Sequence, residues 1–340
     1  MNTKKAEPGY KLGVGLDIGT MNIVSARQNL TGQVEVQRIR DAFLDLDIDA
    51  KRSLRMSKVD YIEKGGSLIV IGDSALTMAN LFKREARRPL SHGVIAAGEL
   101  DAQEVLSLLT AHVLGEPQAS QEHCFYSVPA APIDDLGQDV IYHQGVFRKI
   151  LAEHGYAPHP TNEAMAIIFS QCADENFSGL SVSFGAGMVN VALAYQATKA
   201  MEFSLSRAGD WVDQHAARAV GKTASQACAL KERGIDLANP EGREQEALAL
   251  YLRSVIDYCL QNIAAQFKKV RADVDLPEAI PFVISGGTSK AGGFFEIFEQ
   301  EFEKMRKTFP IKISVVRPAS NPLTAVAEGL LVLAMEEHGA

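Results

Sequence analysis

Hydrophobic and polar positions along the chain follow two patterns, one typical of buried strands and one typical of helices. Apolar runs predict strands at "KLGVGLDIG", "LIVIGD" and "CFYSVP", and helical spacing of apolar positions predicts helices over about 101–114 and 138–154. Strands that alternate with helices in this way indicate an α/β fold. The segment "GYAPHPTNEAM", residues 155–165, places Pro and His between two periodic segments. We interpret it as a domain boundary.

The second half of the chain repeats the alternation. "LSVSFGAGMVNVALAYQ" predicts strands around a glycine turn, and residues 248–270 place apolar side chains at helical spacing: Leu252, Ile256, Cys259, Ile263 and Phe267. Such a stripe is typical of a helix that packs on a core. "PFVISGGTSKAGGFFEIFEQEF" then predicts a strand, a glycine turn and an amphipathic helix. "KISVVRPASNPLTAVAEGLLVLAM" predicts a last strand and a helix with Pro322 in its first turn.

Composition and charge narrow the classes of protein. A length of 340 residues exceeds the size at which a single core usually stops growing, so we expect two domains. A hydrophobic content of 46% and a charged content of 22% are typical of a globular protein. The net charge of -8 disfavours nucleic acid as a partner, and we interpret the basic clusters at 51–58 and 83–88 as solvated surface.

The cysteines and the apolar runs predict the compartment. Cys124, Cys172, Cys228 and Cys259 lack the spacing of metal ligands, and the start of the chain does not resemble a signal peptide. We therefore expect a reduced, cytoplasmic protein. Every apolar run is too short to cross a bilayer, and the polar start lacks an amphipathic anchor, so we do not expect direct membrane insertion.

One carboxylate lies where a charge is costly. In "VGLDIGTMNIVSA", residues 14–26, Asp17 stands among apolar neighbours in a predicted strand. Its solvation loss must be offset by a metal, a hydrogen-bond network or water. Gly19 then permits a tight turn, and Thr20 and Asn22 bring polar side chains beside backbone N–H donors. A turn of this kind suits phosphate.

A second turn of this kind, in "SVSFGAGMVN", follows a strand in the other half. One glycine turn alone is weak evidence for a phosphate site, but two turns that face each other can clamp a polyphosphate. Asp17 would then address a bound Mg²⁺ through water. The alternative is a pair of hairpin turns whose glycines serve backbone geometry only. That alternative leaves Asp17 unexplained.

Five motifs in order resemble those of the actin-like ATPase superfamily, over residues 11–334. They are "GLDIGTMN" and "VSFGAGMVNVAL" for phosphate, "VISGGTSKAGG" for adenosine, and "TNEAMAIIFS" and "NPLTAVAEG" for the two connecting helices. Within the superfamily, "VIGDSA", "PLSHGVIAAGELDAQEVL", "AGDWVDQHA" and "NPLTAVAEGL" are most similar to bacterial actins of the MreB and MamK type. Those proteins polymerise with ATP into cytoskeletal filaments.

The resemblance implies the fold and its domain limits. It predicts two actin-like, ribonuclease H-like α/β domains that flank a nucleotide cleft. The first domain would span 10–155 and include the returning segment 313–340, with a small subdomain at about 32–71. The second would span 156–312, with a reduced small subdomain at about 206–250.

The resemblance also implies a site for ATP or ADP with Mg²⁺. Asp17 would hold Mg²⁺ through water, Glu163 would orient the attacking water, and Ser183 would face the metal. The alternative for Glu163 is an ordinary acidic residue favoured by a helix N-terminus. Gly209 and Asp210 would make a ribose-side or hinge contact. The other implied nucleotide contacts are Gly19, Thr20, Asn22, Gly185, Ala186, Gly187, Lys231, Gly286, Gly287 and Thr288.

Four departures from the superfamily pattern bear on activity or on the size of a subdomain. Ser183 stands where an aspartate is usual and Met188 where a threonine is usual, so the metal side lacks one charge. Weaker Mg²⁺ placement and hydrolysis follow, while backbone recognition of phosphate survives. Cys228 replaces the usual acidic partner of Lys231, which weakens the case for adenine recognition. The segment after Gly234 is also short, which implies a trimmed upper subdomain.

Two functions from different classes remain open. The first is an ATP-binding bacterial actin that assembles with itself, head to tail, and hydrolyses ATP slowly with Mg²⁺. The second is a non-polymerising, nucleotide-dependent binding module or adaptor with weak or lost ATPase activity, which would act through partner proteins. We expect neither a complete DnaK-type chaperone, because no substrate-binding domain follows residue 340, nor a sugar kinase, because no sugar-site element is recognisable.

Overall fold

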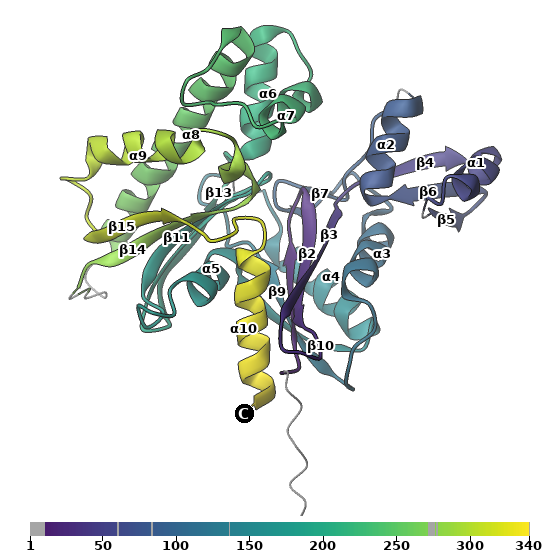
Figure 1. Ribbon diagram of the computed structural model, residues 1–340, viewed down its shortest axis with the longest axis horizontal. Helices are drawn as coiled ribbons and strands as arrows, with labels where there is room; N and C mark the ends of the chain where they lie inside the picture. The colour runs from purple at the N-terminus through teal and green to yellow at the C-terminus, as the bar shows by residue number, and fades with distance from the viewer. Residues whose placement is uncertain are drawn as a thin grey trace, which may run out of the picture.

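Two halves with one shared architecture form the molecule (Figure 1). The computed structural model describes residues 11–339 apart from 60, 83, 136, 271–275 and 277. The expected start of the first domain at residue 10 lies outside this range. Among the described residues, no helix is both long and apolar enough to span a membrane.

The first half is built on a five-stranded sheet. Its strands are β1 (Val14–Ile18), β2 (Asn22–Gln28), β3 (Val34–Arg40), β9 (Glu122–Val128) and β10 (Tyr156–Asn162), in the order β3-β2-β1-β9-β10. The first three are antiparallel, and β9 and β10 are parallel to β1. The helices α3 (Ala102–Leu114) and α4 (Val140–Glu153) pack on one face. They confirm the helices expected from spacing at 101–114 and 138–154.

The second half repeats this sheet strand by strand. It contains β11 (Gly179–Phe184), β12 (Val189–Tyr195), β13 (Thr198–Leu205), β14 (Ile280–Ser285) and β15 (Ile313–Pro318), in the order β13-β12-β11-β14-β15. Again the first three are antiparallel, and the last two are parallel to β11. The helices α8 (Gly242–Val270) and α9 (Phe294–Met305) cover the outer face. Each half therefore presents a strand-to-glycine turn at the same topological position.

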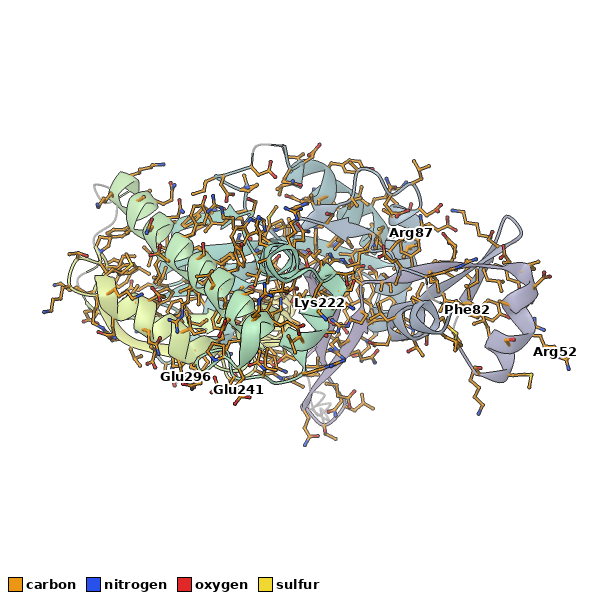
Figure 2. The ribbon with its side chains drawn as sticks, turned by 90° about the horizontal axis from the view of Figure 1, so that it is seen from above. Arg52, Phe82, Arg87, Lys222, Glu241 and Glu296 are labelled. Atoms are coloured by element: carbon orange, nitrogen blue, oxygen red, sulfur yellow. The ribbon has the colours of Figure 1, made fainter. Side chains whose placement is uncertain are left out.

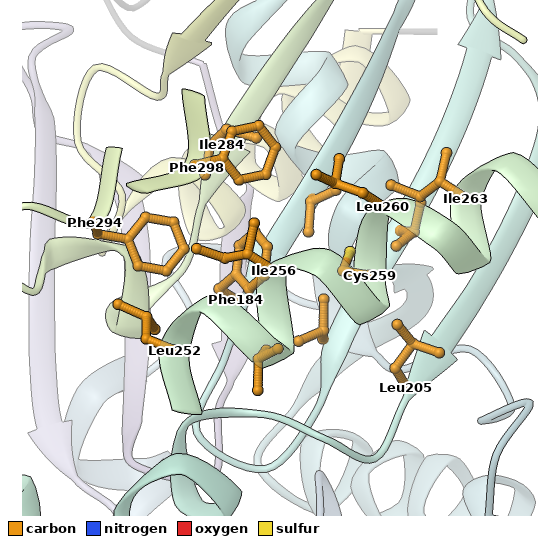
Figure 3. Packing of buried hydrophobic residues seen from close by; sticks show 14 of the residues in the cluster. Phe184, Leu205, Leu252, Ile256, Cys259, Leu260, Ile263, Ile284, Phe294 and Phe298 are labelled. Atoms are coloured by element: carbon orange, nitrogen blue, oxygen red, sulfur yellow. The ribbon is translucent and has the colours of Figure 1, made fainter. Parts of the chain in front are cut away.

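A stripe of apolar side chains on α8 packs into the core of the second half (Figure 3). The expected residues Leu252, Ile256, Cys259, Ile263 and Phe267 are all buried in one cluster. Phe184, the last residue of β11, packs edge-on against Phe294 of α9, with ring centroids 5.0 Å apart. Because Phe184 directly precedes the glycine turn, this packing holds the turn in place.

Two helices connect the halves and lie side by side between the two sheets (Figure 1). They are α5 (Glu163–Gln171), which follows β10, and α10 (Ala325–Gly339), which follows β15 and its short linker. Their backbones nearly touch, since a Cβ atom placed on Gly329 would lie 1.8 Å from the Ala166 carbonyl oxygen. The sheets place β10 with the first half and β15 with the second. The chain therefore passes from the first half to the second, and back again, a few residues later than the expected limits at 155 and 312.

Each half carries a smaller upper part. In the first, β4 (Phe43–Asp47), β5 (Tyr61–Lys64) and β6 (Ser67–Ile71) form a small sheet with α1 (Lys51–Met56) and α2 (Gly72–Phe82). A short hairpin, β7 (Leu90–Ser91) and β8 (Val94–Ile95), leads back. In the second, α6 (Gly209–Val220), α7 (Ala224–Glu232) and the start of α8 form a helical subdomain, with no strand between β13 and β14 among the described residues. Figure 2 shows Arg52 and Phe82 toward one end of the molecule and Glu241 and Glu296 toward the other.

Candidate functional site

A cleft of about 360 Å³ lies between the halves, at the turns that follow β1 and β11. It brings together all but two of the site residues expected from the sequence. The expected residues that line it are Asp17, Gly19, Thr20, Asn22, Glu163, Ser183, Gly185, Ala186, Gly187, Lys231, Gly286, Gly287 and Thr288. The two that do not line it are Gly209 and Asp210.

The two glycine turns share one geometry and touch each other. The Gly19 N–H donates to the Asn22 carbonyl at 3.0 Å, and the Gly185 N–H donates to the Met188 carbonyl at 3.0 Å. A Cβ atom on Gly187 would lie 2.3 Å from the Gly93 nitrogen and 2.4 Å from Thr20 Oγ1, so only glycine fits between the halves. The paired turns thus bring polar backbone and side-chain groups from both halves to one end of the cleft.

Asp17 is anchored by the neighbouring parallel strand. Its Oδ1 accepts a hydrogen bond from Ser127 Oγ at 3.0 Å. Ser127 Oγ in turn accepts a hydrogen bond from the Ile18 N–H at 2.7 Å. Burial raises the pKa of Asp17 to about 6, although the Ser127 hydrogen bond lowers it. An ionised Asp17 is therefore costly here, and a cation nearby would offset that cost.

Glu163 meets Asp17 from the start of α5. The preceding Asn162 caps this helix, since its Oδ1 accepts from the Ala164 and Met165 N–H groups at 2.9 and 3.2 Å. Burial first, and then the charge of Asp17, raise the pKa of Glu163 well above its ordinary value. Glu163 does lie at a helix N-terminus, as the alternative interpretation had it, yet it also lines the cleft.

Asn190, which the sequence analysis did not single out, holds Glu163. Its Nδ2 donates to Glu163 Oε2 at 2.9 Å, and its Oδ1 accepts from Ser204 Oγ. Asn190 is 1% exposed and belongs to the otherwise apolar strand β12. A polar residue in an apolar strand is the same signal that drew attention to Asp17.

Ser183 is the counterpart of Asp17 in the repeated topology. Asp17 is the fourth residue of β1 and lies opposite Val24 of β2, while Ser183, near the end of β11, lies opposite Asn190 of β12. The parallel neighbour of Asp17 supplies Ser127, and the parallel neighbour of Ser183 supplies Ser285. At this pair of equivalent strand positions, only the first half therefore supplies a carboxylate.

The third glycine segment approaches the second turn closely. Gly286 has φ +93°, and a Cβ atom there would lie 2.5 Å from the Phe184 nitrogen and oxygen. Thr288 Oγ1 donates to the Gly185 carbonyl at 2.8 Å. The segment from Gly286 to Thr288 therefore closes the wall of the cleft next to the second glycine turn.

Lys231 has an acidic partner that sequence spacing did not reveal. Its Nζ donates to both carboxylate oxygens of Asp213 at 2.8 Å, and Asp213 lies on α6 rather than one turn earlier on α7. Burial raises the pKa of Asp213, and the Lys231 charge opposes that shift. Cys228 lines the cleft beside this pair. The missing carboxylate at position 228 is thus replaced in space by Asp213.

Asp210 instead contacts the opposite half. Arg88 donates to its two carboxylate oxygens at 2.8 and 3.2 Å. Asp210 therefore joins the two halves and does not line the cleft. The expectation that the cluster at 83–88 is solvated surface is wrong for Arg88, because its side chain is 32% exposed and joins the two halves.

The residues present fit a nucleotide and one divalent cation. The Asn22 side-chain oxygen is buried in the cleft wall without a hydrogen-bond partner in the described part of the chain. Asp17 and Glu163 both have raised pKa values that a cation would reverse. Within the described residues, no group of three or more Cys, His, Asp or Glu could hold a metal by itself.

Two halves of one topology that enclose a cleft between glycine turns are the arrangement of the actin-like fold. The chain belongs to the Volactin family, whose sequence pattern matches residues 12–334. No curated protein sequence matches the chain significantly.

Solved structures confirm the actin-like fold over nearly the whole chain. A MamK double helical filament is 18% identical with a TM-score of 0.68, and the match covers 95% of this chain and 98% of that one. MreB5 of Spiroplasma citri bound to AMPPNP is 16% identical with a TM-score of 0.66, over 97% and 99% of the two chains. The ethanolamine utilization protein EutJ of Carboxydothermus hydrogenoformans is 16% identical with a TM-score of 0.53, over 96% and 90%.

Proposed function

We propose that this protein binds ATP or ADP with Mg²⁺ in the cleft, hydrolyses ATP slowly and assembles head to tail into filaments in the cytoplasm. The observation that carries the proposal is the meeting of Asp17 and Glu163 beside two contacting glycine turns, one from each half. Backbone N–H groups at such turns bind phosphate, and phosphoryl transfer depends on positioning and charge neutralisation.

Different residues of the chain would bind the metal, align the water and face the sugar. Bound Mg²⁺ would neutralise phosphate charge and would be held by Asp17 through water. The Asn190 bond orients the carboxylate of Glu163, which can then align a water molecule and accept its proton. A bound cation would favour the ionised form of Glu163, which burial disfavours and which a general base requires. Lys231, paired with Asp213, would face the sugar end of the nucleotide.

Relatives of the same fold support the nucleotide and the filament. The MamK structure is a double helical filament, and structures of MreB5 hold AMPPNP or ADP. Assembly would follow from the shape of the closed subunit, because a rigid unit with unlike ends stacks into an open polymer.

Ser183 favours a second candidate function. With one carboxylate fewer than the superfamily pattern at the metal side, the cleft could hold nucleotide without turning it over. The protein would then be a nucleotide-dependent binding module that acts through adaptor proteins and does not polymerise.

Titration calorimetry with ATP, ADP and GTP, each with Mg²⁺, tests the site. We expect binding of the adenine nucleotides, and we expect Asp17→Ala to weaken the Mg²⁺-dependent part of it. If no nucleotide binds at millimolar concentration, the proposed function is wrong. A preference for GTP would contradict only the choice of adenine.

A further inference from the structure

Two arginines of the first half cross to carboxylates of the second half. Arg40, at the end of β3, donates to Glu232, at the end of α7, at 2.8 and 3.0 Å. Arg88, before the β7–β8 hairpin, donates to Asp210 of α6 at 2.8 and 3.2 Å. Arg40 and Glu232 also line the cleft, so this pair lies at the path to the site.

Each arginine also faces a carboxylate of its own half. Arg40 Nε lies 3.9 Å from Asp73 Oδ1, on the small subdomain of the first half. The charge of Arg88 lowers the pKa of Asp41, which burial raises well above its ordinary value. Asp41 is 1% exposed, and within the described part of the chain its carboxylate oxygens have no side-chain hydrogen-bond partner, although the Leu90 backbone also lowers its pKa. In this arrangement the ionised form of Asp41 is therefore costly, because its carboxyl group is buried without an ion pair to a side chain among the described residues.

Because of this arrangement, separation of the two halves would exchange the carboxylate partners of both arginines. When the halves separate, Arg88 loses Asp210 but can turn to Asp41, and Arg40 loses Glu232 but can turn to Asp73. A buried carboxylate without a hydrogen-bonded cation is costly, so Asp41 favours the open arrangement and the two crossing pairs favour the closed one. Two packings that differ by a small free energy are what a conformational switch requires.

We propose that Arg40 and Arg88 form a two-position latch that sets how fast a ligand leaves the cleft. The inference rests on the proposed function in one respect, namely that the ligand is a nucleotide. The side chains of Arg88 and Asp210 are only 32% and 16% exposed, so solvent screens this pair less than an ordinary surface pair. Glu232 is 45% exposed, so the Arg40 pair contributes less.

The test uses opposite effects from two carboxylates that face the same arginine. Release of a fluorescent ATP analogue, bound with Mg²⁺ and chased with excess ATP, is followed by stopped flow. Asp210→Asn should speed release about five-fold or more, and Glu232→Gln should speed it less. Asp41→Asn should slow release, because it removes the open-state partner of Arg88. Glu301→Gln is the matched control, since the Arg253–Glu301 pair lies within the second half, and it should leave release unchanged.

A distance measurement keeps the latch testable if the analogue does not bind. Spin labels are placed at Met56→Cys and Leu250→Cys, two positions that are 78% and 65% exposed on different halves, in a Cys228→Ser background. In nucleotide-free protein, Asp210→Asn should lengthen the distance between labels and Asp41→Asn should shorten it. The latch is wrong if the two variants shift release and distance in the same direction, or shift neither. Absence of analogue binding with the opposed distance shifts intact would contradict the proposed function and leave the latch standing.

Discussion

At the scale of single residues, Ser183 is the departure with the clearest chemical consequence. It stands at the position in β11 that Asp17 holds in β1, next to a strand that supplies a serine in both halves. A serine can hold a water molecule but cannot neutralise a dication.

We expect Ser183→Asp to raise Mg²⁺-dependent ATP turnover about ten-fold or more, if the added charge contributes about 1.4 kcal/mol to the transition state. Steady-state phosphate release measures this. Glu163→Ala should depress turnover and spare nucleotide affinity, which separates chemistry from binding. Lower turnover in a stably folded Ser183→Asp protein would mean that the serine belongs to a rearranged site.

Asn190 is expected to set the pH dependence of turnover through Glu163. Its hydrogen bond lowers the pKa of Glu163, so Asn190→Ala should raise that pKa. The acid limb of the turnover profile should then move to higher pH, and turnover at neutral pH should fall several-fold. Ser181→Ala is a suitable control, because it removes a buried hydrogen bond to the Ala164 carbonyl without touching the Glu163 carboxylate. An unchanged profile in Asn190→Ala would exclude this role.

At the scale of elements, the crossing of α5 and α10 depends on the absence of a side chain. We expect Gly329→Ala to lower the free energy of unfolding by about 2 kcal/mol or more, because its Cβ would clash with the Ala166 carbonyl. Gly145→Ala makes the same change in α4, where a Cβ meets nothing within 4 Å, and should stabilise by about 0.5–1 kcal/mol. Urea unfolding of both variants measures the difference. Equal effects would show that the crossing tolerates a side chain.

The helix α4 also buries a histidine that makes the fold sensitive to acid. Neither ring nitrogen of His143 has a partner within the described residues, and burial lowers its pKa to about 4. The unfolded chain binds this proton near pH 6.5, so stability from the neutral ring is complete above that pH. It is lost as pH falls toward 4.

We therefore expect His143→Leu to flatten the dependence of unfolding free energy on pH between about 6.5 and 4. The loss in the wild type from this residue should reach about 3 kcal/mol at most. Urea titrations at several pH values measure it. His112→Gln, at an exposed position of α3, should keep the wild-type slope. A His143→Leu slope equal to that of the wild type would contradict the argument.

At the scale of the whole molecule, closure of the halves is expected to control assembly. Nucleotide phosphates would bind groups from both glycine turns and thereby select one relative orientation of the halves. We expect Mg²⁺ and ATP to promote sedimentable filaments, checked by pelleting and electron microscopy with and without nucleotide. Particles that stay monomeric at high protein concentration with every nucleotide would favour the binding module instead.

The sequence by itself determined the α/β class, the strand-to-turn positions of Asp17 and Ser183 and the apolar stripe of α8. These features depend on periodicity and turn chemistry within about twenty residues, so neighbouring positions carry the information. The motif order then indicated the actin-like fold and 13 of the 28 described residues that line the cleft.

Only the tertiary structure decided which charges meet. Asp213 replaces the missing partner of Lys231 from 18 positions away, Asn190 reaches Glu163 across 27 positions, and Arg88 finds Asp210 across 122. Side-chain pairing at such separations depends on how the sheets and helices pack, and local pattern places no constraint on it. The basic cluster at 83–88 shows this, because local composition predicts solvated surface while packing places Arg88 between the halves, beside the buried Asp41.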